Sequence, residues 1–438
     1  MKGLKGDMEI RDPIHGSIEL SRAEVAVLDS LAYQRLRSIK QLGFSEFSFP
    51  GATHNRYLHS IGVCHLAAVA FDHIFKDFQF SNHQVRQRLR QVLRLAALLH
   101  DIGHGPLSHT TEEVMPPLGD LGVEIYRLRQ GAPDLKSRAN HEDYTIKFIT
   151  DSSLTPILRA QFPDIGPEHI ACLVDVSLQV EDDFFLDQGF NFRVILSQLI
   201  SSEMDVDRLD YLARDAYFCG TNYGKVEQSW LLANMSSHLV DGNLHLALNR
   251  RALYTFDDFL LARHHMHLMV YFHHKGIIYE EILSRYLTSP DCSFFLPAEI
   301  EEYIKCTDYA LFEHLASVDN PWARRISERK PFRMLFELHS TRATERPEKM
   351  AQALESEGVE VIWASSQLRL SKYHTMTPQE KPFGIYVVDQ YDRRAQPYSL
   401  QDSTEIFKKY EEIRTIDRLY VAPEKFAQAE GLILSRQL

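Results

Sequence analysis

The sequence lacks paired cysteines, which excludes the folds that depend on them. Its five cysteines stand apart from one another, without a Cys-x-x-Cys pair: Cys64, Cys172, Cys219, Cys292 and Cys306. This spacing fits neither a disulfide framework nor a zinc ribbon. We therefore expect free, buried or half-buried thiols in a protein of a reducing compartment.

The sequence also lacks long apolar runs. The N-terminal residues MKGLKGDMEIRDPIHG have no apolar signal-peptide core, and no later stretch is long enough to span a bilayer. These absences predict a cytoplasmic protein without a membrane partner.

Positive charge is scarce as well. There are 48 Lys and Arg residues against 60 Asp and Glu residues, which gives a net charge of −12. Because affinity for duplexes comes largely from Lys and Arg, we do not expect nucleic acid as a partner. A small phosphorylated substrate in a locally basic pocket is compatible with this charge.

Helical patterns dominate what is present. Of the 438 residues, 44% are hydrophobic, enough for a large core. Helical spacing of apolar residues is strongest over 84–104 and recurs over 192–217 and 253–288. Alternating segments such as VEVIWASS and FGIYVVDQY predict strands near the C-terminus. We expect a mainly α fold, with a helical core over 1–330 and a smaller α+β lobe over 331–438.

Possible metal ligands gather in the first half of the chain. His100 and Asp101 stand together at a helix end before Gly103, where the backbone can aim both side chains at one point. Each such residue alone is more often an ordinary polar residue than a ligand. With His59 and Asp207, however, three helices supply nitrogen and oxygen donors, as in metal sites of helical bundles. This donor set suits Fe, Mn, Zn, Co or Mg.

A longer series of motifs resembles a known family. In order along residues 10 to about 225 stand DPIHGSIEL, LAYQRLRSIKQLG, FPGATHNRYLHSIGV, LLHDIGHGPLSH, NHEDY and DVDRLDYLARD. They resemble the HD superfamily and, within it, the SAM-and-HD-domain deoxynucleoside triphosphate triphosphohydrolases. A fainter similarity continues through 255–290. Because the chain starts directly at the HD core, we expect a bacterial-type relative without the SAM module.

The resemblance implies a role for each matching residue. The implied metal ligands are His59, His100, Asp101 and Asp207. The implied catalytic residues are His104, His109, His141 and Glu142. The implied substrate-binding residues are Gln41, Leu42, Arg56, Arg208, Tyr211, Asp215, Arg263, His267 and Tyr271. The implied site for an activating nucleotide is Asp29, Gln34 and Arg37, although Met8 and Glu9 stand near the position of the family's accompanying lysine.

Helical spacing supports part of this assignment independently. Asp207, Tyr211 and Asp215 stand at i, i+4 and i+8, which places a metal ligand, an aromatic ring and a carboxylate on one helix face. A ring against C2′ with a carboxylate on the 3′-hydroxyl would favour deoxyribose. The positions 263, 267 and 271 repeat this spacing on another helix, where the alternative is an ordinary amphipathic face.

The resemblance implies hydrolysis of a dNTP to a deoxynucleoside and inorganic triphosphate, with His109 or His104 protonating the leaving 5′-oxygen. It also implies an additional Mg²⁺ with the triphosphate, a GTP or dNTP activator, and a homo-oligomer, either dimer or tetramer. The ligand set alone leaves two alternatives open. One is an HD phosphodiesterase or nucleotidase acting on another nucleotide, and the other is a nucleotide-sensing module.

Overall fold

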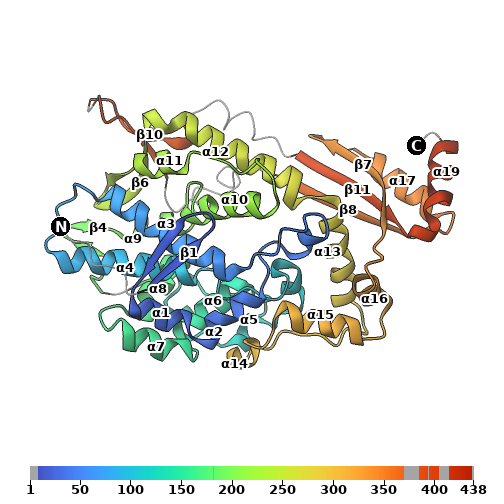
Figure 1. Ribbon diagram of the computed structural model, residues 1–438, viewed down its shortest axis with the longest axis horizontal. Coiled ribbons are helices and arrows are strands. Elements are labelled where there is room, and N and C mark those ends of the chain that lie inside the picture. The colour runs from blue at the N-terminus through green and yellow to red at the C-terminus, as the bar shows by residue number, and fades with distance from the viewer. Residues whose placement is uncertain are drawn as a thin grey trace.

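Helices make up most of the computed structural model, as the sequence predicts (Figure 1). The structure describes residues 8–180, 182–342, 344–368, 384–392, 394–403 and 414–436. The helices of the first half are α1 (Arg22–Leu28), α2 (Leu31–Gln34), α3 (Arg56–Ile74), α4 (His83–Leu99), α5 (Leu118–Leu121), α6 (His141–Thr150), α7 (Leu154–Gln161), α8 (Pro167–Val174), α9 (Arg193–Ile200) and α10 (Val206–Phe218).

The remaining helices of the described ranges follow α10 along the chain. They are α11 (Gln228–Asn234), α12 (Leu253–Met266), α13 (His274–Leu287), α14 (Ile300–Tyr303), α15 (Asp308–Ser317), α16 (Pro321–Ser327), α17 (Arg346–Glu355) and α19 (Phe426–Arg436). Between α12 and α13 the chain forms a π-helical turn, η6 (His267–Tyr271).

Helix α3 lies at the centre of the core. Most of its side chains are buried, and it packs against α4, α10 and α11. Asn55 starts α3 and Asn82 starts α4, each with a side-chain oxygen that accepts a backbone N–H of the first turn. These caps set where both helices begin, and α4 ends at His100.

Three small sheets accompany the helices in the described residues. Strands β1 (Met8–Asp12) and β2 (Gly16–Leu20) form an antiparallel hairpin. A mixed sheet contains β3 (Leu186–Asp187), β4 (Phe190–Asn191), β5 (Met235–Val240), β6 (Asn243–Asn249), β9 (Tyr386–Val388) and β10 (Tyr398–Ser399). A third sheet has the antiparallel order β7-β11-β8, from β7 (Arg333–Ser340), β8 (Val361–Leu368) and β11 (Arg414–Val421).

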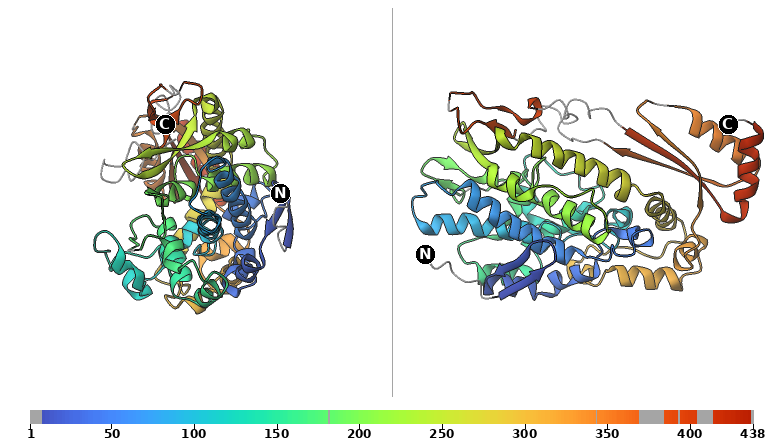
Figure 2. Two further views of the ribbon diagram at one scale, coloured as in Figure 1. Left: turned by 90° about the vertical axis from the view of Figure 1, so that its left-hand side faces the viewer. Right: turned by 45° about the horizontal axis from the view of Figure 1, so that its top comes forward.

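The third sheet, with α17 and α19, extends from one end of the helical core (Figures 1 and 2). Ile362, Ala364 and Tyr420 pack there against buried side chains of α13 and α16. Strand β7 begins close to the predicted boundary at 330. However, β9 pairs in parallel with β6, so a segment from the predicted lobe completes a sheet of the core. The division at 330 stays a prediction.

All five cysteines are free, and each is buried or partly buried. None of the helices in the described part of the chain has both the length and the apolar character needed to cross a bilayer.

Candidate metal centre

The four predicted metal ligands come together between α3, α4 and α10. His59 lies in the first turns of α3, His100 and Asp101 follow α4, and Asp207 lies in the first turn of α10. Asp207 Oδ1 lies 2.9 Å from His59 Nε2 and 3.6 Å from His100 Nε2. Asp101 Oδ1 lies 3.4 Å from His100 Nε2, and Asp101 Oδ2 lies 3.6 Å from His59 Nε2.

Two nitrogens in this group are buried without a hydrogen-bond partner of suitable geometry: Nε2 of His59 and Nε2 of His100. An unsatisfied buried polar atom costs about 1–3 kcal/mol, so such atoms call for a physical reason. Donor atoms of His59, His100 and Asp207 lie within 4.8 Å of one another. These side chains therefore fit a divalent ion, with the unpartnered nitrogens as ligands.

The Nδ1 atoms of His59 and His100 each have a hydrogen-bond partner. His59 Nδ1 lies 2.8 Å from Asp210 Oδ2, and His100 Nδ1 lies 2.8 Å from the carbonyl oxygen of Ala97. Such outer partners fix the ring orientation and leave Nε2 free for a metal. Burial lowers the pKa of His59, but the carboxylates of Asp207 and Asp210 outweigh it and raise the pKa to about 10. The pocket thus favours a positive charge at this point, which a bound cation would supply.

Asp210 was not predicted from the sequence, yet it is the centre of a buried network. It accepts hydrogen bonds from Arg214 Nε at 2.8 Å and Arg214 Nη2 at 2.9 Å, and its Oδ1 lies 2.6 Å from His15 Nε2. Arg214 Nη1 also donates to Asp12 Oδ2 at 2.8 Å. The i, i+4 spacing of Asp210 and Arg214 was a visible signal for this pair.

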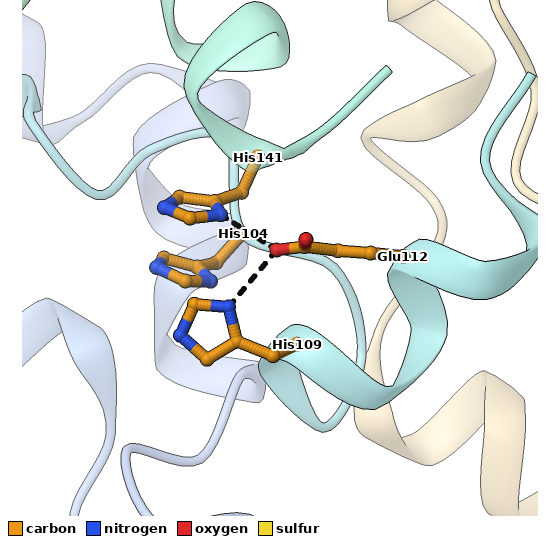
Figure 3. A group of neighbouring side chains, drawn as sticks. All are labelled: His104, His109, Glu112 and His141. Carbon is orange, nitrogen blue, oxygen red and sulfur yellow. Dashed lines mark hydrogen bonds and ion pairs between the residues drawn. The ribbon is translucent and has the colours of Figure 1, made fainter. Parts of the chain in front are cut away.

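Figure 3 shows a second group of donors, which approaches the first where His104 Nε2 lies 3.3 Å from Asp101 Oδ1. Glu112 Oε1 lies 3.0 Å from His109 Nδ1 and 2.6 Å from His141 Nδ1. The ring of His104 stacks on that of His141, with centroids 3.9 Å apart. Burial raises the pKa of Glu112, but hydrogen bonds from His109 and His141 lower it to about 2.

Three of the four predicted catalytic residues therefore assemble around a carboxylate that the sequence did not indicate. Glu112 lies on the 3-10 turn η3 (Ser108–Val114), three residues after His109, and this spacing was the available signal. Glu142 is exposed in the first turn of α6. Its catalytic role stays a prediction.

Arg56 points into the metal centre. Its Nη1 donates to Asp101 Oδ2, and its Nε and Nη2 donate to Ser108 Oγ at 3.2 and 2.7 Å. Arg208 donates to the Asp205 carboxylate and lies one residue after Asp207. Arg56 thus contacts a candidate ligand directly, whereas the side chain of Arg208 pairs with Asp205 beside the group.

The row predicted to hold the sugar lies near the second row of predicted substrate residues. Tyr271 Oη donates to Asp215 Oδ2 at 2.8 Å, and His54 Nε2 lies 2.8 Å from Asp215 Oδ1. The rings of Tyr211 and Tyr271 are 6.2 Å apart, and that of His267 is 4.9 Å from Tyr271. Tyr271 and His267 lie on the π-helical turn, a feature frequent at functional sites.

The remaining predicted substrate residues lie around these rows. Arg263 Nη1 donates to Glu203 Oε2 at 3.1 Å on the inner side of α12. Gln41 N donates to the carbonyl oxygen of His54 at 3.1 Å, and Gln41 Oε1 is buried without a hydrogen-bond partner. Leu42, the next residue, is half-buried.

Two of the three predicted effector residues, Gln34 and Arg37, lie together beside the buried Tyr57. Arg37 Nε donates to Gln34 Oε1 at 2.8 Å, and the Arg37 guanidinium lies 3.6 Å from the centroid of the Tyr57 ring. Asp29 is exposed at the end of α1. Met8 and Glu9, which stand near the position of the family's lysine, lie on β1.

Two protein-family models match this chain, and the first covers the predicted metal ligands. Residues 56–215 match the HD domain model, and residues 230–362 match the HD associated region. Uncharacterized protein MG461 of Mycoplasma genitalium is 33% identical over 274 residues, 62% of this chain and 57% of that protein. Human deoxynucleoside triphosphate triphosphohydrolase SAMHD1 is 29% identical over 357 residues, 75% of this chain and 54% of that protein.

The chain spans little more than half the length of the curated relatives that it matches. Among solved structures, a hypothetical protein from Aquifex aeolicus aligns over 97% of this chain and 99% of its own, with a TM-score of 0.73 and 23% identity. That similarity establishes a common fold.

Proposed function

Because this chain belongs to the HD-domain superfamily, we propose that it is a metal-dependent phosphohydrolase that converts a dNTP to a deoxynucleoside and inorganic triphosphate. The observation that carries the metal dependence is the pair of buried Nε2 atoms of His59 and His100 beside Asp207, neither of which has a hydrogen bond of suitable geometry. The similarity to triphosphohydrolases of dNTPs supports the substrate class.

His59, His100, Asp101 and Asp207 would hold the ion. A divalent ion offsets the negative charge of phosphoryl oxygens and makes a bound water more acidic. The mixed nitrogen and oxygen donors suit Fe, Mn, Zn or Co, and Mg²⁺ could enter with the triphosphate. Arg56 and Arg208, now paired with carboxylates, would turn toward the phosphates and bind them by charge-assisted hydrogen bonds.

His109 is the better candidate for protonating the leaving 5′-oxygen. Its side chain is 70% exposed, so it can approach a bound substrate, whereas His104 is buried and stacked under His141. Glu112 accepts from Nδ1 of His109, which leaves Nε2 to carry the transferred proton. Glu112 also holds His141 and so fixes both rings in one orientation.

The tyrosines and Asp215 would select the sugar. Both carboxylate oxygens of Asp215 already have one partner each, Tyr271 and His54, which fixes the plane of the carboxylate. A carboxylate oxygen has a second lone pair, so Asp215 can also accept from a 3′-hydroxyl. The ring of Tyr211 lies 6.2 Å from that of Tyr271 and would pack against C2′, which favours a deoxyribose.

Activation by GTP or a dNTP, and assembly to a dimer or tetramer, also belong to this proposal. Arg37 lies over the Tyr57 ring and donates to Gln34, and Asp29 is exposed at the end of α1, so these residues offer a cation, an amide and a carboxylate. Size-exclusion chromatography with and without each nucleotide tests this, because an unchanged elution volume in all cases contradicts nucleotide-driven assembly.

Product analysis tests the activity. The purified protein is incubated with each dNTP and Mn²⁺, and the phosphate products are separated by ion exchange. Inorganic triphosphate supports the proposal, while orthophosphate or pyrophosphate contradicts it. Asp207→Asn should lower the rate by at least about 100-fold because the ion loses a charged ligand. Asp258→Asn, which changes an exposed carboxylate on α12, is the matched control.

The same assay separates the alternatives. A panel of nucleoside monophosphates, cyclic nucleotides and (p)ppGpp detects an HD nucleotidase or phosphodiesterase. Tight nucleotide binding without turnover in Mn²⁺ would instead indicate a sensing module. The panel also includes each ribonucleotide, since the proposed sugar site predicts slower turnover of rNTPs than of dNTPs.

A further inference from the structure

Figure 3 shows three imidazole rings and a carboxylate converging on one point. His104, His109 and His141 each turn a nitrogen toward Glu112. They come from three separate segments: the loop after α4, the turn η3 and the start of α6. One donor atom from each of the four side chains lies within 4.8 Å of all the others.

Hydrogen bonds within the group do not satisfy all of its polar atoms. Glu112 Oε1 is the hydrogen-bond partner of two imidazole nitrogens, those of His109 and His141. In contrast, Nδ1 of His104 is buried without a hydrogen-bond partner. His104 itself is only 3% exposed, so water does not compensate for the missing partner. An electron-pair acceptor in the centre of the group would satisfy this nitrogen and the others together.

The spacing is close to what a four-coordinate ion requires. A tetrahedral ion with ligands at about 2.0–2.1 Å separates neighbouring ligand atoms by about 3.3 Å. Glu112 Oε1 now lies 2.6 Å from His141 Nδ1 and 3.0 Å from His109 Nδ1. Small rotations of these side chains, of which His109 is largely exposed, would give the required separation.

We propose that His104, His109, Glu112 and His141 form a second metal site, selective for a nitrogen-preferring ion such as Zn²⁺ or Co²⁺. Three imidazoles and one carboxylate are typical ligands of these ions, whereas Mg²⁺ prefers oxygen. Asp101 lies between the two groups of donors, since its Oδ1 is 3.4 Å from His100 Nε2 and 3.3 Å from His104 Nε2.

Occupancy of this second site has a consequence for regulation, which rests on the proposed function. In that function the imidazole of His109 carries a proton and Glu112 orients it. An ion bound to the same side chains competes with that proton and fixes the rings. Excess Zn²⁺ is therefore an inhibitor, while Mg²⁺ is not.

Counting bound ions tests the site without any nucleotide. Metals are removed from the full chain with a chelator, and Co²⁺ or Zn²⁺ is then titrated with equilibrium dialysis and the visible absorption of Co²⁺ as readouts. We expect two ions per chain for the wild type and one for His141→Ala. Glu112→Gln keeps the shape of the side chain and should weaken the second ion by about 10-fold to 100-fold or more.

Two further variants test whether the loss of an ion is specific to the second site. Glu113→Gln changes the neighbouring carboxylate, which accepts from Ser284 instead, and should still bind two ions. Asp207→Asn should weaken the other ion and leave the second site filled. One ion per chain in the wild type, or two ions of unchanged affinity in both His141→Ala and Glu112→Gln, would overturn the proposal whatever reaction the protein catalyses.

Discussion

At the scale of the residue, Asp210 orients a metal ligand without belonging to the predicted ligand set. It is fully buried, and its carboxylate meets His59, His15 and Arg214. Burial raises the pKa of Asp210, but Arg214 outweighs this effect and holds the pKa well below its ordinary value. Asp210 therefore stays charged and keeps Nδ1 of His59 as the donor and Nε2 as the ligand.

Asp210→Asn should weaken the metal at His59 by about 10-fold to 100-fold, the usual cost of losing an outer partner of a metal-bound histidine. The reason is that an amide is a weaker acceptor for His59 and leaves Arg214 without its counter-charge. Metal content after dialysis against graded chelator concentrations measures this loss. Asp164→Asn, on an exposed loop, is the control, and equal metal affinity in both variants contradicts the role of Asp210.

Space around this network is also limited. A Cβ atom added at Gly62 on α3 would lie 2.0 Å from Asp210 Oδ1 and 2.4 Å from Arg214 Nη2. No side chain fits there unless the buried ion pair moves. Glycine in the middle of a helix costs about 0.5–1 kcal/mol relative to alanine, and here the close approach of the network gives the reason.

At the scale of the element, the start of α1 is tied to α4 by a buried ion pair. Ser21 and Glu24 form a capping box at the start of α1. Arg94 Nε and Nη2 donate to Glu24 at 2.6 and 2.9 Å, and Gln91 Nε2 donates at 2.8 Å. Glu24 thus both caps its own helix and holds α4, whose last residue precedes His100.

Glu24→Gln should destabilise the protein by about 3–5 kcal/mol at neutral pH, because Arg94 would be left buried without its partner charge. Glu19→Gln, an exposed neighbour, should stay within about 0.5 kcal/mol of the wild type. Urea unfolding at several pH values measures both. An equal stability of the two variants would show that the ion pair contributes nothing.

The Glu24–Arg94 ion pair makes the stability of the protein depend on pH, and the direction of this dependence follows from the pKa of Glu24. Burial raises the pKa of Glu24, but Arg94 outweighs this and the pKa lies below its ordinary value in the folded protein. The stabilisation is therefore complete above the unfolded pKa of about 4.3 and is lost as pH falls through the lower folded pKa. We expect the wild type to lose more stability than Glu24→Gln on acidification through this window.

At the scale of the whole molecule, the C-terminal sheet is joined to the helical core by an apolar contact. Ile362 and Tyr420 are almost completely buried against α13 and α16, and Tyr420 Oη donates to the carbonyl oxygen of His274 at 3.0 Å. His274 starts α13, directly after the π-helical turn that carries Tyr271. The sheet therefore supports the helix that follows the proposed sugar site.

Ile362→Ala should lower the free energy of unfolding by about 2–5 kcal/mol, since it leaves a cavity in this contact. Glu360→Ala, an exposed neighbour, should change it by no more than about 0.5 kcal/mol. Calorimetry measures both, and we expect the sheet and the core to unfold together. A separate, low-temperature transition that Ile362→Ala alone shifts would contradict this coupling.

The sequence by itself determined the helical character and the four candidate ligands, because periodicity and ordered motifs are local in the chain. Only the tertiary structure decided which carboxylates complete the site. Glu112 and Asp210 reach the histidines through the packing of α3, α10, η3 and α6, whereas Glu142, beside His141 in the sequence, faces outward. Adjacent helical residues point about 100° apart, so proximity along the chain does not predict a shared site. In the same way, the parallel pairing of β9 with β6 joins residues far apart in sequence, and no local pattern encodes that partner.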